Sequence, residues 1–210
     1  MKKKISEIVI ALAVLFLIIL APLYLISFNK NFYKREFEKY SVYESFSENK
    51  SFIDNQFEDV LSHLQGKTNF PETNFYNEKE KAHLKDVKKI YALVRWILFL
   101  SVLAVLSFVL IERKDGDLIL KGIKYGSVSA FIFIIILLVA VLINFEQVFV
   151  LFHKLLFNNN LWILNPETDN LIRMLPQEIF FDLSKRFILC VLSLSFLLVF
   201  GTMFLLKKVR

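Results

Sequence analysis

The sequence predicts an all-α membrane protein with four transmembrane helices. Three observations lead to this prediction: 56% of the residues are hydrophobic, glycine and proline are scarce, and long apolar stretches recur along the chain. Such a composition is too apolar for a soluble domain of 210 residues. A helix needs about 20 mostly apolar residues to cross a hydrocarbon core of about 30 Å.

Four stretches meet this requirement. They are Ile8 to Phe28, Ile90 to Ile111, Ser127 to Phe145 and Phe187 to Leu206. The first follows three lysines, as the apolar part of a signal peptide would, but it is longer than such a segment and no small-residue cleavage site follows it. We therefore expect it to stay attached as a membrane helix.

The charges of the short connections predict the orientation. Lysine and arginine are concentrated at the N-terminus, between the second and third apolar stretches, and at the C-terminus. Short basic segments remain in the cytoplasm, whereas long segments weigh little. We therefore expect a plasma membrane protein with both termini in the cytoplasm and two long extracytoplasmic connections. The expected divisions are the membrane helices 1–28, 90–111, 127–145 and 187–206, the outer segments 29–89 and 146–186, the cytoplasmic loop 112–126 and the cytoplasmic tail 207–210.

The first outer connection is predicted to be ordered. Its charged residues are interleaved with aromatic ones, which favours an interfacial layer or one or two short strands over disorder. These aromatic residues are Phe32, Tyr33, Phe37, Tyr40, Tyr43 and Phe46. Apolar residues in 53–64 follow helical spacing, and Gly66 is placed as the C-terminal stop. A turn-rich passage with Pro71 leads to Asn77, which forms a capping-box pattern with Glu80 and opens a helix that runs into the second span.

The second outer connection has three parts, and together with the first it predicts a small extracytoplasmic cap. Residues 145–157 predict either an extension of the third membrane helix or a helix lying in the membrane interface, which the asparagines at 158–160 end. Asn165, which precedes a proline, predicts the start of a short helix through Met174, and Pro176 restarts the helix of the fourth span. Three aromatic residues suit a belt at the membrane surface: Trp162, Phe180 and Phe181.

Several classes of function are disfavoured. The net charge of +6 would suggest nucleic acid in a soluble protein, but these basic residues flank apolar stretches, so we expect no nucleic-acid partner. The single cysteine, Cys190, lies in an apolar stretch, which excludes an intramolecular disulfide and a cysteine-based metal cluster. Motifs of the nucleophile elbow, the phosphate-binding loop and the dinucleotide fold are missing from the sequence.

All three histidines are predicted to lie on the extracytoplasmic side. His83 precedes Ile90 by seven residues on a continuous helix, which puts it roughly 10 Å above the hydrocarbon edge at about 1.5 Å per residue. His153 reaches a similar height if the third helix continues straight past Phe145. Two imidazoles at the depth of lipid esters suit acid/base chemistry, although each residue could also be a simple interfacial anchor. We expect His63 to be a solvated helix residue.

Two charged residues near His83 each allow two interpretations. Asp86 follows it by three residues and could orient the imidazole or pair with Lys89. Arg95 lies inside an apolar stretch, where charge is costly, so we expect it to hold a lipid phosphate or an ester carbonyl rather than only to snorkel to the headgroups. Two histidines and one carboxylate make a sparse zinc site, and the paired-histidine zinc motif is absent from the sequence.

Two segments carry a family resemblance. The segment NFYNEKEKAHLKDVK at 74–88 contains Glu80, His83, Asp86 and Val87, and it resembles the Glu-x-x-His-x-x-Asp-Val motif of the lipoprotein intramolecular transacylase (Lit) family of low-GC Gram-positive bacteria. Residues 152–182 resemble that family's long second motif. The resemblance implies a membrane acyltransferase that moves the sn-2 acyl chain of a diacylglyceryl-cysteine lipoprotein to the α-amine of the same cysteine, giving a lyso-form lipoprotein. It implies no cofactor.

The resemblance also assigns the chemistry to His83 and His153, and it implies lipoproteins and membrane lipids as partners. We expect His83 to act as the acid/base and His153 to hold the ester or the tetrahedral oxyanion, with Asn159, Arg95 and Trp162 in support. Two other classes stay open. One is a non-enzymatic accessory protein with an extracytoplasmic partner, and the other is a small transporter, for which the apolar stretches hold few polar residues.

Overall fold

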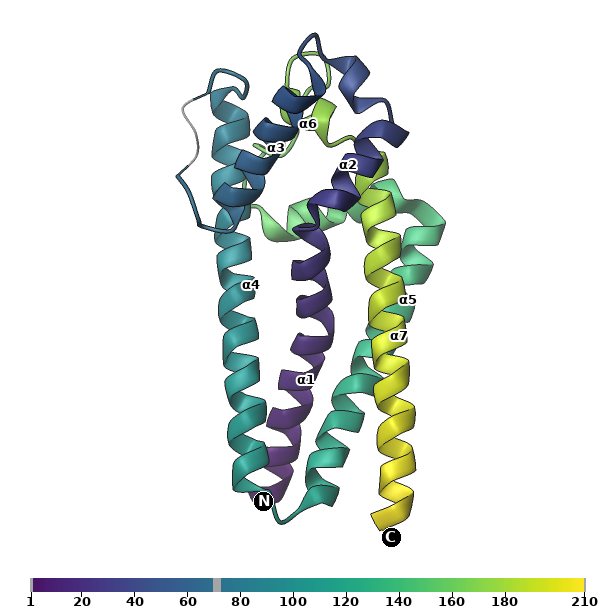
Figure 1. Ribbon diagram of the computed structural model, residues 1–210. Coiled ribbons are helices and arrows are strands. Elements are labelled where there is room, and N and C mark those ends of the chain that lie inside the picture. Colours follow the sequence, from purple (N-terminus) through teal and green to yellow (C-terminus); the bar gives the residue numbers. More distant parts are fainter. Residues whose placement is uncertain (1, 70–72, 210) are drawn as a thin grey trace. The chain divides into compact units, whose positions relative to one another are not determined.

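The chain is helical, and its computed structural model describes residues 2–69 and 73–209. The elements are α1 (Lys2–Ser27), α2 (Lys30–Lys39), the 3-10 helix η1 (Val42–Ser45), α3 (Lys50–Leu64), α4 (Glu78–Ile111), α5 (Gly116–Leu156), α6 (Asn170–Met174) and α7 (Gln177–Val209) (Figure 1). The all-α fold class is thus confirmed. Pro71 of the predicted turn and Arg210 of the basic tail lie outside the described residues.

The chain divides into two compact units. The first, which we call the span unit, comprises Met1–Ile26, Val94–Ile143 and Lys185–Arg210. The second, which we call the cap unit, comprises Ser27–Leu93 and Asn144–Ser184. The cap unit is therefore built from the two long connections that the sequence predicts to form a cap.

The span unit contains the apolar parts of four helices. Those that are long and apolar enough to cross a membrane are Lys2–Ser27, Glu78–Ile111, Gly116–Leu156 and Gln177–Lys208. Only 11% of the most apolar stretch of α4 and 17% of that of α5 is buried within the protein. So much exposed leucine, isoleucine and phenylalanine surface is unfavourable in water and suits lipid as the solvent.

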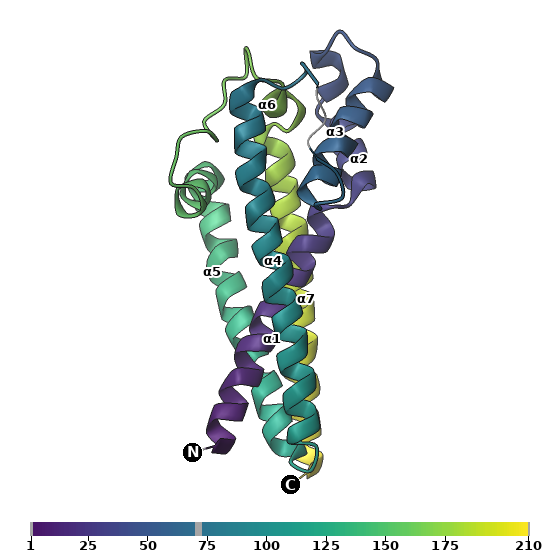
Figure 2. The same ribbon diagram turned by 90° about the vertical axis from the view of Figure 1, so that its left-hand side faces the viewer.

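Close packing joins α1 to α5 within the span unit, and Figure 2 shows the two helices crossing. Gly122 and Gly126 lie one turn apart on α5 and face α1. A Cβ atom on Gly126 would lie 2.4 Å from the carbonyl oxygen of Ala11, and one on Gly122 would lie 2.7 Å from the Ile10 side chain. Two small residues at this spacing let helix backbones approach closely, as in many membrane helix pairs.

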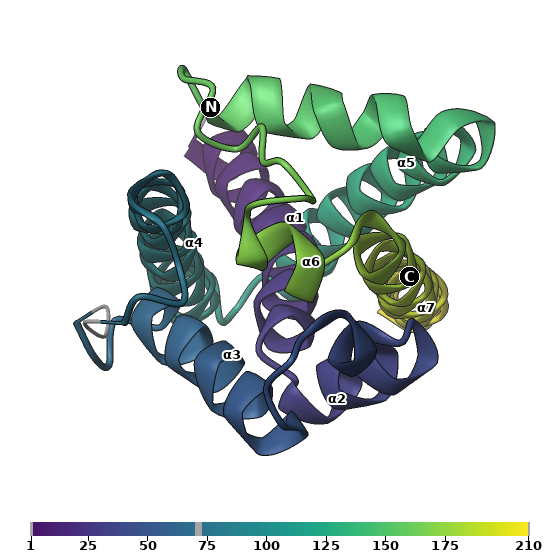
Figure 3. The same cartoon turned by 90° about the horizontal axis from the view of Figure 1, so that it is seen from above.

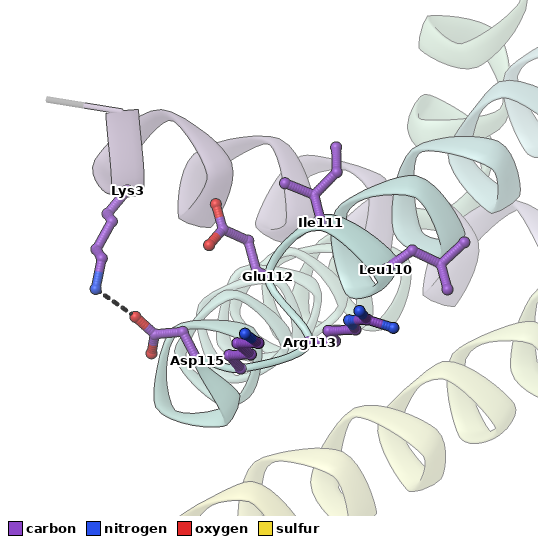
Figure 4. Close-up of a pocket in the computed structure, with 7 residues that line it drawn as sticks. Lys3, Leu110, Ile111, Glu112, Arg113 and Asp115 are labelled. Atoms are coloured by element: carbon purple, nitrogen blue, oxygen red, sulfur yellow. Dashed lines mark hydrogen bonds and ion pairs between the residues drawn. The ribbon is translucent and has the colours of Figure 1, made fainter.

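One end of the span unit gathers the basic segments. Both termini and the α4–α5 turn lie at this end (Figure 1). The ammonium of Lys3 lies 2.6 Å from the carboxylate of Asp115, and the Ser6 hydroxyl donates to Glu112 at 2.9 Å. Figure 4 shows Lys3 and Asp115 meeting beside an open hollow that Arg113 also lines. The three basic segments therefore share one end of the unit, as the predicted orientation requires.

The cap unit has its own hydrophobic core. Side chains from α2, α3, α4, α6 and α7 contribute to it, and Phe32, Phe37, Phe57, Met174 and Ile179 are at most 2% exposed. Figure 3 shows the short helix α6 between α2, α3, α4 and α7, the elements that share this core. A core of this kind resembles that of a soluble domain, in contrast to the exposed apolar helices of the span unit.

The prediction of short strands in the first connection was wrong. The structure has helix α2 and the 3-10 helix η1 there, and it has no strand anywhere in 2–69 or 73–209. The buried residues of α2 are Phe32, Tyr33, Glu36 and Phe37, whose spacing of one, four and five positions is that of a helix face rather than of alternation. Asn29 caps this helix by accepting the Phe32 N–H at 3.1 Å.

The predicted helix ends around residue 66 and residue 77 are confirmed. Gly66 adopts a left-handed φ of 76°, and α3 closes with two hydrogen bonds, from Gly66 N–H to the His63 carbonyl at 2.9 Å and from Lys67 N–H to the Ser62 carbonyl at 3.0 Å. Helix α4 then runs unbroken from Glu78 to Ile111, as predicted from the absence of a breaker.

Helix α5 does not continue straight past the third apolar stretch. Asn144 has φ −160° and ψ 94°, which kinks the helix and separates 116–143 from 145–156. The Asn144 side chain accepts the Gln147 N–H at 2.9 Å and so caps the second segment. The height estimated for His153 assumed a straight helix, and that assumption was wrong.

The second connection differs from prediction at one helix start. Helix α6 begins at Asn170 rather than near Asn165, because Asp169 is extended, with φ −104° and ψ 120°, and its carboxylate accepts the Asn165 N–H at 2.8 Å. Helix α7 begins at Gln177, directly after Pro176, as predicted.

Candidate active site

Two imidazoles meet in the cap unit. His83 on α4 and His153 on α5 have ring centroids 6.3 Å apart, although 70 positions of sequence separate them. His83 is 8% exposed and His153 is half-buried. The structure therefore brings together the two histidines that the sequence singled out.

A backbone hydrogen bond orients the His153 ring. Its Nδ1 lies 2.8 Å from the carbonyl oxygen of Phe149, one turn earlier on α5. Because a carbonyl can only accept, Nδ1 carries the proton in this arrangement, and Nε2 of the neutral ring keeps a lone pair. His153 is thus set up to accept a proton at Nε2.

Both imidazoles are held neutral at pH 7. Burial and, second, the neighbouring His153 lower the pKa of His83 to about 4, against the opposing effect of Asp86. Burial also lowers the pKa of His153, and the Phe149 carbonyl opposes this effect. Both histidines lie outside the apolar stretches 90–111 and 127–145. The Nδ1 atom of His83 is buried without a hydrogen-bond partner among the described residues, so this ring keeps an unused polar atom.

Aromatic rings surround the pair. Phe157 packs edge-on against His83 with centroids 5.1 Å apart, and Trp162 stacks on His153 at 4.9 Å with an interplanar angle of 28°. The Phe149 ring is a further aromatic neighbour, with its centroid 4.3 Å from that of the His153 ring. Such walls exclude water and fix the ring planes. The predicted belt residue Trp162 therefore lies at the histidine pair itself.

The other two predicted belt residues pack on the same segment of α5. Phe180 lies 5.4 Å from the ring of Phe149, and Phe181 lies 5.1 Å from the ring of Phe145. Both therefore support the helix that carries His153, and their role in a membrane belt stays a prediction.

Asp86 links α4 to the loop after α5. Lys89 donates to one carboxylate oxygen at 2.8 Å, and Asn159 donates to the other at 3.0 Å. These two hydrogen bonds hold the pKa of Asp86 below its usual value. Asn159 in turn accepts the Leu161 N–H at 3.1 Å, which forms a tight turn just before Trp162. The expected pairing of Asp86 with Lys89 is present, and the bond to Asn159 is additional.

Glu80 has a larger role than the sequence indicates. Its side chain closes the predicted capping box with Asn77 and also accepts the N–H of Leu171 at 2.5 Å. The residue is 1% exposed, and burial raises the pKa of its carboxyl above the usual value. Glu80 thus fastens the start of α4, three residues before His83, to α6. The spacing with Asn77 predicts the cap, but nothing in the sequence signals the contact with Leu171.

The remaining candidates have different outcomes. The prediction that His63 is solvated was wrong, because it is 4% exposed within the cap unit. Arg95 is part of the span unit, and its role at the site stays a prediction. Within 2–69 and 73–209, no three histidine, cysteine or carboxylate side chains are grouped as metal ligands.

The fold and the histidine pair define a helical membrane protein with a candidate acid/base site in aromatic surroundings. The family model described as lipoprotein intramolecular transacylase Lit matches residues 8–181. The chain therefore belongs to the Lit family, as the two motifs predicted. It is an integral membrane protein of a family of enzymes that modify lipoproteins.

Solved structures agree with this assignment. The chain is 26% identical to the membrane integral lipoprotein intramolecular transacylase Lit from Bacillus cereus, with a TM-score of 0.87 over 100% of this chain and 98% of that one. Two variants of the Bacillus cereus protein, with one histidine changed to arginine or to alanine, give TM-scores of 0.79 and 0.80 at 25% identity. They cover 94% and 96% of those chains and all of this one. No curated protein sequence matches the chain.

Proposed function

We propose that the chain transfers the sn-2 acyl group of a diacylglyceryl-cysteine lipoprotein to the α-amine of the same cysteine, leaving a lyso-form lipoprotein. Membership of the Lit family supports the class of reaction. The observation that carries the proposal is the pair of neutral imidazoles, 6.3 Å apart between centroids and supplied by two different helices. Such a pair can remove one proton and stabilise developing charge within a single small site.

The reaction needs five events. The substrate ammonium loses a proton, and the amine nitrogen attacks the ester carbonyl carbon while the carbonyl electrons move to oxygen. The nitrogen then loses a second proton, the tetrahedral intermediate collapses as the bond to the glyceryl oxygen breaks, and that oxygen takes a proton. Counted from the ammonium form, the products are an amide, an alcohol and one released proton, so the site must accept protons and stabilise an oxyanion.

The geometry favours a division of roles that is the reverse of the one expected from sequence. His153 has its Nδ1 proton held by Phe149, so its Nε2 lone pair is ready to take a proton from the amine. His83, with a pKa of about 4, would take a proton from an ammonium of pKa near 8 at a cost of roughly 5 kcal/mol. As a neutral ring it instead donates an N–H to the ester oxygen, where the negative charge forms.

The surroundings suit an intramolecular transfer. Because the amine and the ester belong to one molecule, holding them in contact supplies much of the rate enhancement. The rings of Phe157 and Trp162 keep water from the acyl group, which limits competing hydrolysis. Asn159 and Asp86 support this arrangement by fixing the turn that precedes Trp162.

The orientation completes the proposal: both termini lie in the cytoplasm and the cap unit lies outside the cell. The basic end of the span unit supports it. Single cysteines can test it in a protein with Cys190→Ala. Exposed positions Asn49 and Glu167 should react with an impermeant thiol reagent in intact cells, and Lys114 should react only after lysis. The reversed labelling pattern would contradict the orientation.

The transfer itself can be followed with isotopes. Purified protein in vesicles receives a diacylglyceryl-cysteine peptide whose sn-2 chain alone is deuterated, mixed with an unlabelled peptide of different sequence. We expect mass spectrometry to find the deuterated chain on the nitrogen of its own peptide only. Deuterium on the second peptide would indicate an intermolecular reaction, and deuterium left on glycerol would indicate transfer of the other chain. Absence of any product would favour an accessory role.

A further inference from the structure

The second segment of α5, residues 145–156, presents three different faces. One face points into the cap unit and carries Phe145, Phe149 and His153 at intervals of four residues. A second face is mostly polar: it carries Glu146, Gln147 and Lys154, which together with Val150 and Leu151 line a shallow hollow beside the kink. The first face is buried in the packing of the cap unit, and the second face can hydrogen-bond with water.

The third face is apolar and exposed. Leu155 is 75% exposed, Leu151 is 56% exposed and Phe152 is 52% exposed. These residues recur at intervals of one, three and four positions, so they form one side of the helix. A row of large apolar side chains on a helix that also has a polar row is the pattern of a helix lying in a membrane interface.

The residues that directly precede the segment in the chain indicate what covers this face. Leu142 and Ile143, the last residues before the kink, are 71% and 79% exposed, and they end an apolar stretch long enough to cross the membrane. The chain resumes its helix after the single residue Asn144. The segment therefore starts at the edge of the hydrocarbon, where a side chain such as Leu151 reaches acyl chains and Lys154 reaches headgroups.

We propose that 145–156 lies in the extracytoplasmic membrane interface, with Leu151, Phe152 and Leu155 among lipid acyl chains and Glu146, Gln147 and Lys154 at the headgroups. The partner of this surface is the lipid monolayer. As a consequence, which rests on the proposed function, the inward-facing His153 lies at the depth of the substrate esters. A lipoprotein then reaches the site by lateral movement within its own leaflet.

Spin labels can test the placement independently of activity. In a protein with Cys190→Ala, single nitroxide labels are placed at Leu151 and Leu155 on the apolar face and at Gln147 and Lys154 on the polar face. The protein is reconstituted in vesicles of phosphatidylcholine and phosphatidylglycerol. Collision rates with oxygen, which concentrates in lipid, and with a water-soluble nickel chelate are then measured. A label at Leu106 on α4 gives the lipid reference, and one at Asn49 gives the water reference.

We expect the two leucine positions to match the lipid reference and the two polar positions to match the water reference. Leucine labels as accessible to nickel as the water reference would overturn the proposal. Leucine labels reached by neither reagent, with spin–spin broadening that disappears on dilution with unlabelled protein, would also overturn it. That result would assign the face to a second copy of the chain.

An activity measurement tests the consequence. Leu155→Lys should lower transfer on vesicle-embedded substrate roughly tenfold, because an apolar contact with lipid is replaced by a charge. A short-chain substrate dissolved in detergent should react at nearly the wild-type rate. The matched variant Gln147→Lys should behave as wild type with both substrates. Equal loss with both substrates would contradict delivery through the membrane, and an inactive wild type would contradict the proposed function while leaving the spin-label result intact.

Discussion

The span unit and the cap unit are stabilised in different ways. In the span unit most apolar surface remains exposed to lipid, and close approach through small residues such as Gly126 holds α1 against α5. In the cap unit large aromatic residues are buried, and buried polar groups such as Glu80 tie distant segments together. A substitution that one unit tolerates should therefore damage the other.

This difference explains where the candidate site lies. Lipid offers no partner for polar groups, so a site that moves protons needs the ordered polar contacts of the cap unit. In that unit His83 packs against Phe157, and His153 stacks on Trp162 and hydrogen-bonds to the Phe149 carbonyl. The span unit supplies anchoring in the membrane.

The largest structural effect is expected for added volume in the span unit. Gly126→Ala should destabilise the protein by about 1–3 kcal/mol, because the new Cβ meets the Ala11 backbone. Thermal unfolding in detergent measures the change. Gly201→Ala on α7 is the matched control, since nothing lies within 4 Å of its Cβ position. Equal unfolding temperatures for the two variants would contradict the close α1–α5 packing.

A second stability effect, of similar size, is expected for a polar change in the cap unit. Glu80→Gln should cost about 1–3 kcal/mol, because an amide NH₂ then faces the N–H of Asn77 or of Leu171. Glu78→Gln is the control, because this carboxylate is 90% exposed and pairs only with Lys81 among the described residues. Hydrogen exchange of the amides around α6 should rise in the first variant alone. Unchanged exchange in both would show that Glu80 does not fasten α6.

The smallest effect concerns pH. Burial and, second, Lys88 lower the pKa of His63 from 6.5. In the unfolded chain the ring binds a proton near pH 6.5, and in the folded protein it resists doing so. Stability is therefore unaffected above this pH and decreases as the pH falls below it. The unfolding temperature of His63→Leu should show a weaker loss between pH 7.5 and pH 5 than that of the wild type. Parallel curves would contradict this origin.

The accuracy of prediction depends on whether a feature is set by neighbouring residues or by tertiary contacts. Span length, the stop at Gly66 and the capping box at Asn77 depend on neighbouring residues, so the sequence reveals them. The contact of Glu80 with Leu171 joins positions 91 residues apart, and tertiary packing alone decides it. The aromatic residues of α2 were predicted to form an interfacial layer or short strands because charged residues are interleaved with them, and burial against α3 decided for a helix instead of strands.

The histidine pair shows how much of the candidate site can be predicted from the sequence. Its two members were identified from their motifs and their predicted height, but the helix that carries His153 bends at Asn144. The Phe149 carbonyl that fixes the tautomer of His153 is available on any helix, so no sequence pattern announces it. The pairing of the two residues was therefore predictable, the bend and the tautomer were not, and the roles of both histidines in the reaction stay a proposal.

The most direct test of the central claim measures lyso-form product from His83→Gln and His153→Gln in vesicles. Glutamine can donate a hydrogen bond but cannot take a proton at neutral pH. His153→Gln should lose roughly 10²- to 10⁴-fold in rate and His83→Gln should keep a measurable remainder, with unchanged unfolding temperatures. Normal product from either variant would contradict the assignment of that histidine to the reaction. A larger remaining rate in His153→Gln than in His83→Gln would restore the roles first expected from sequence.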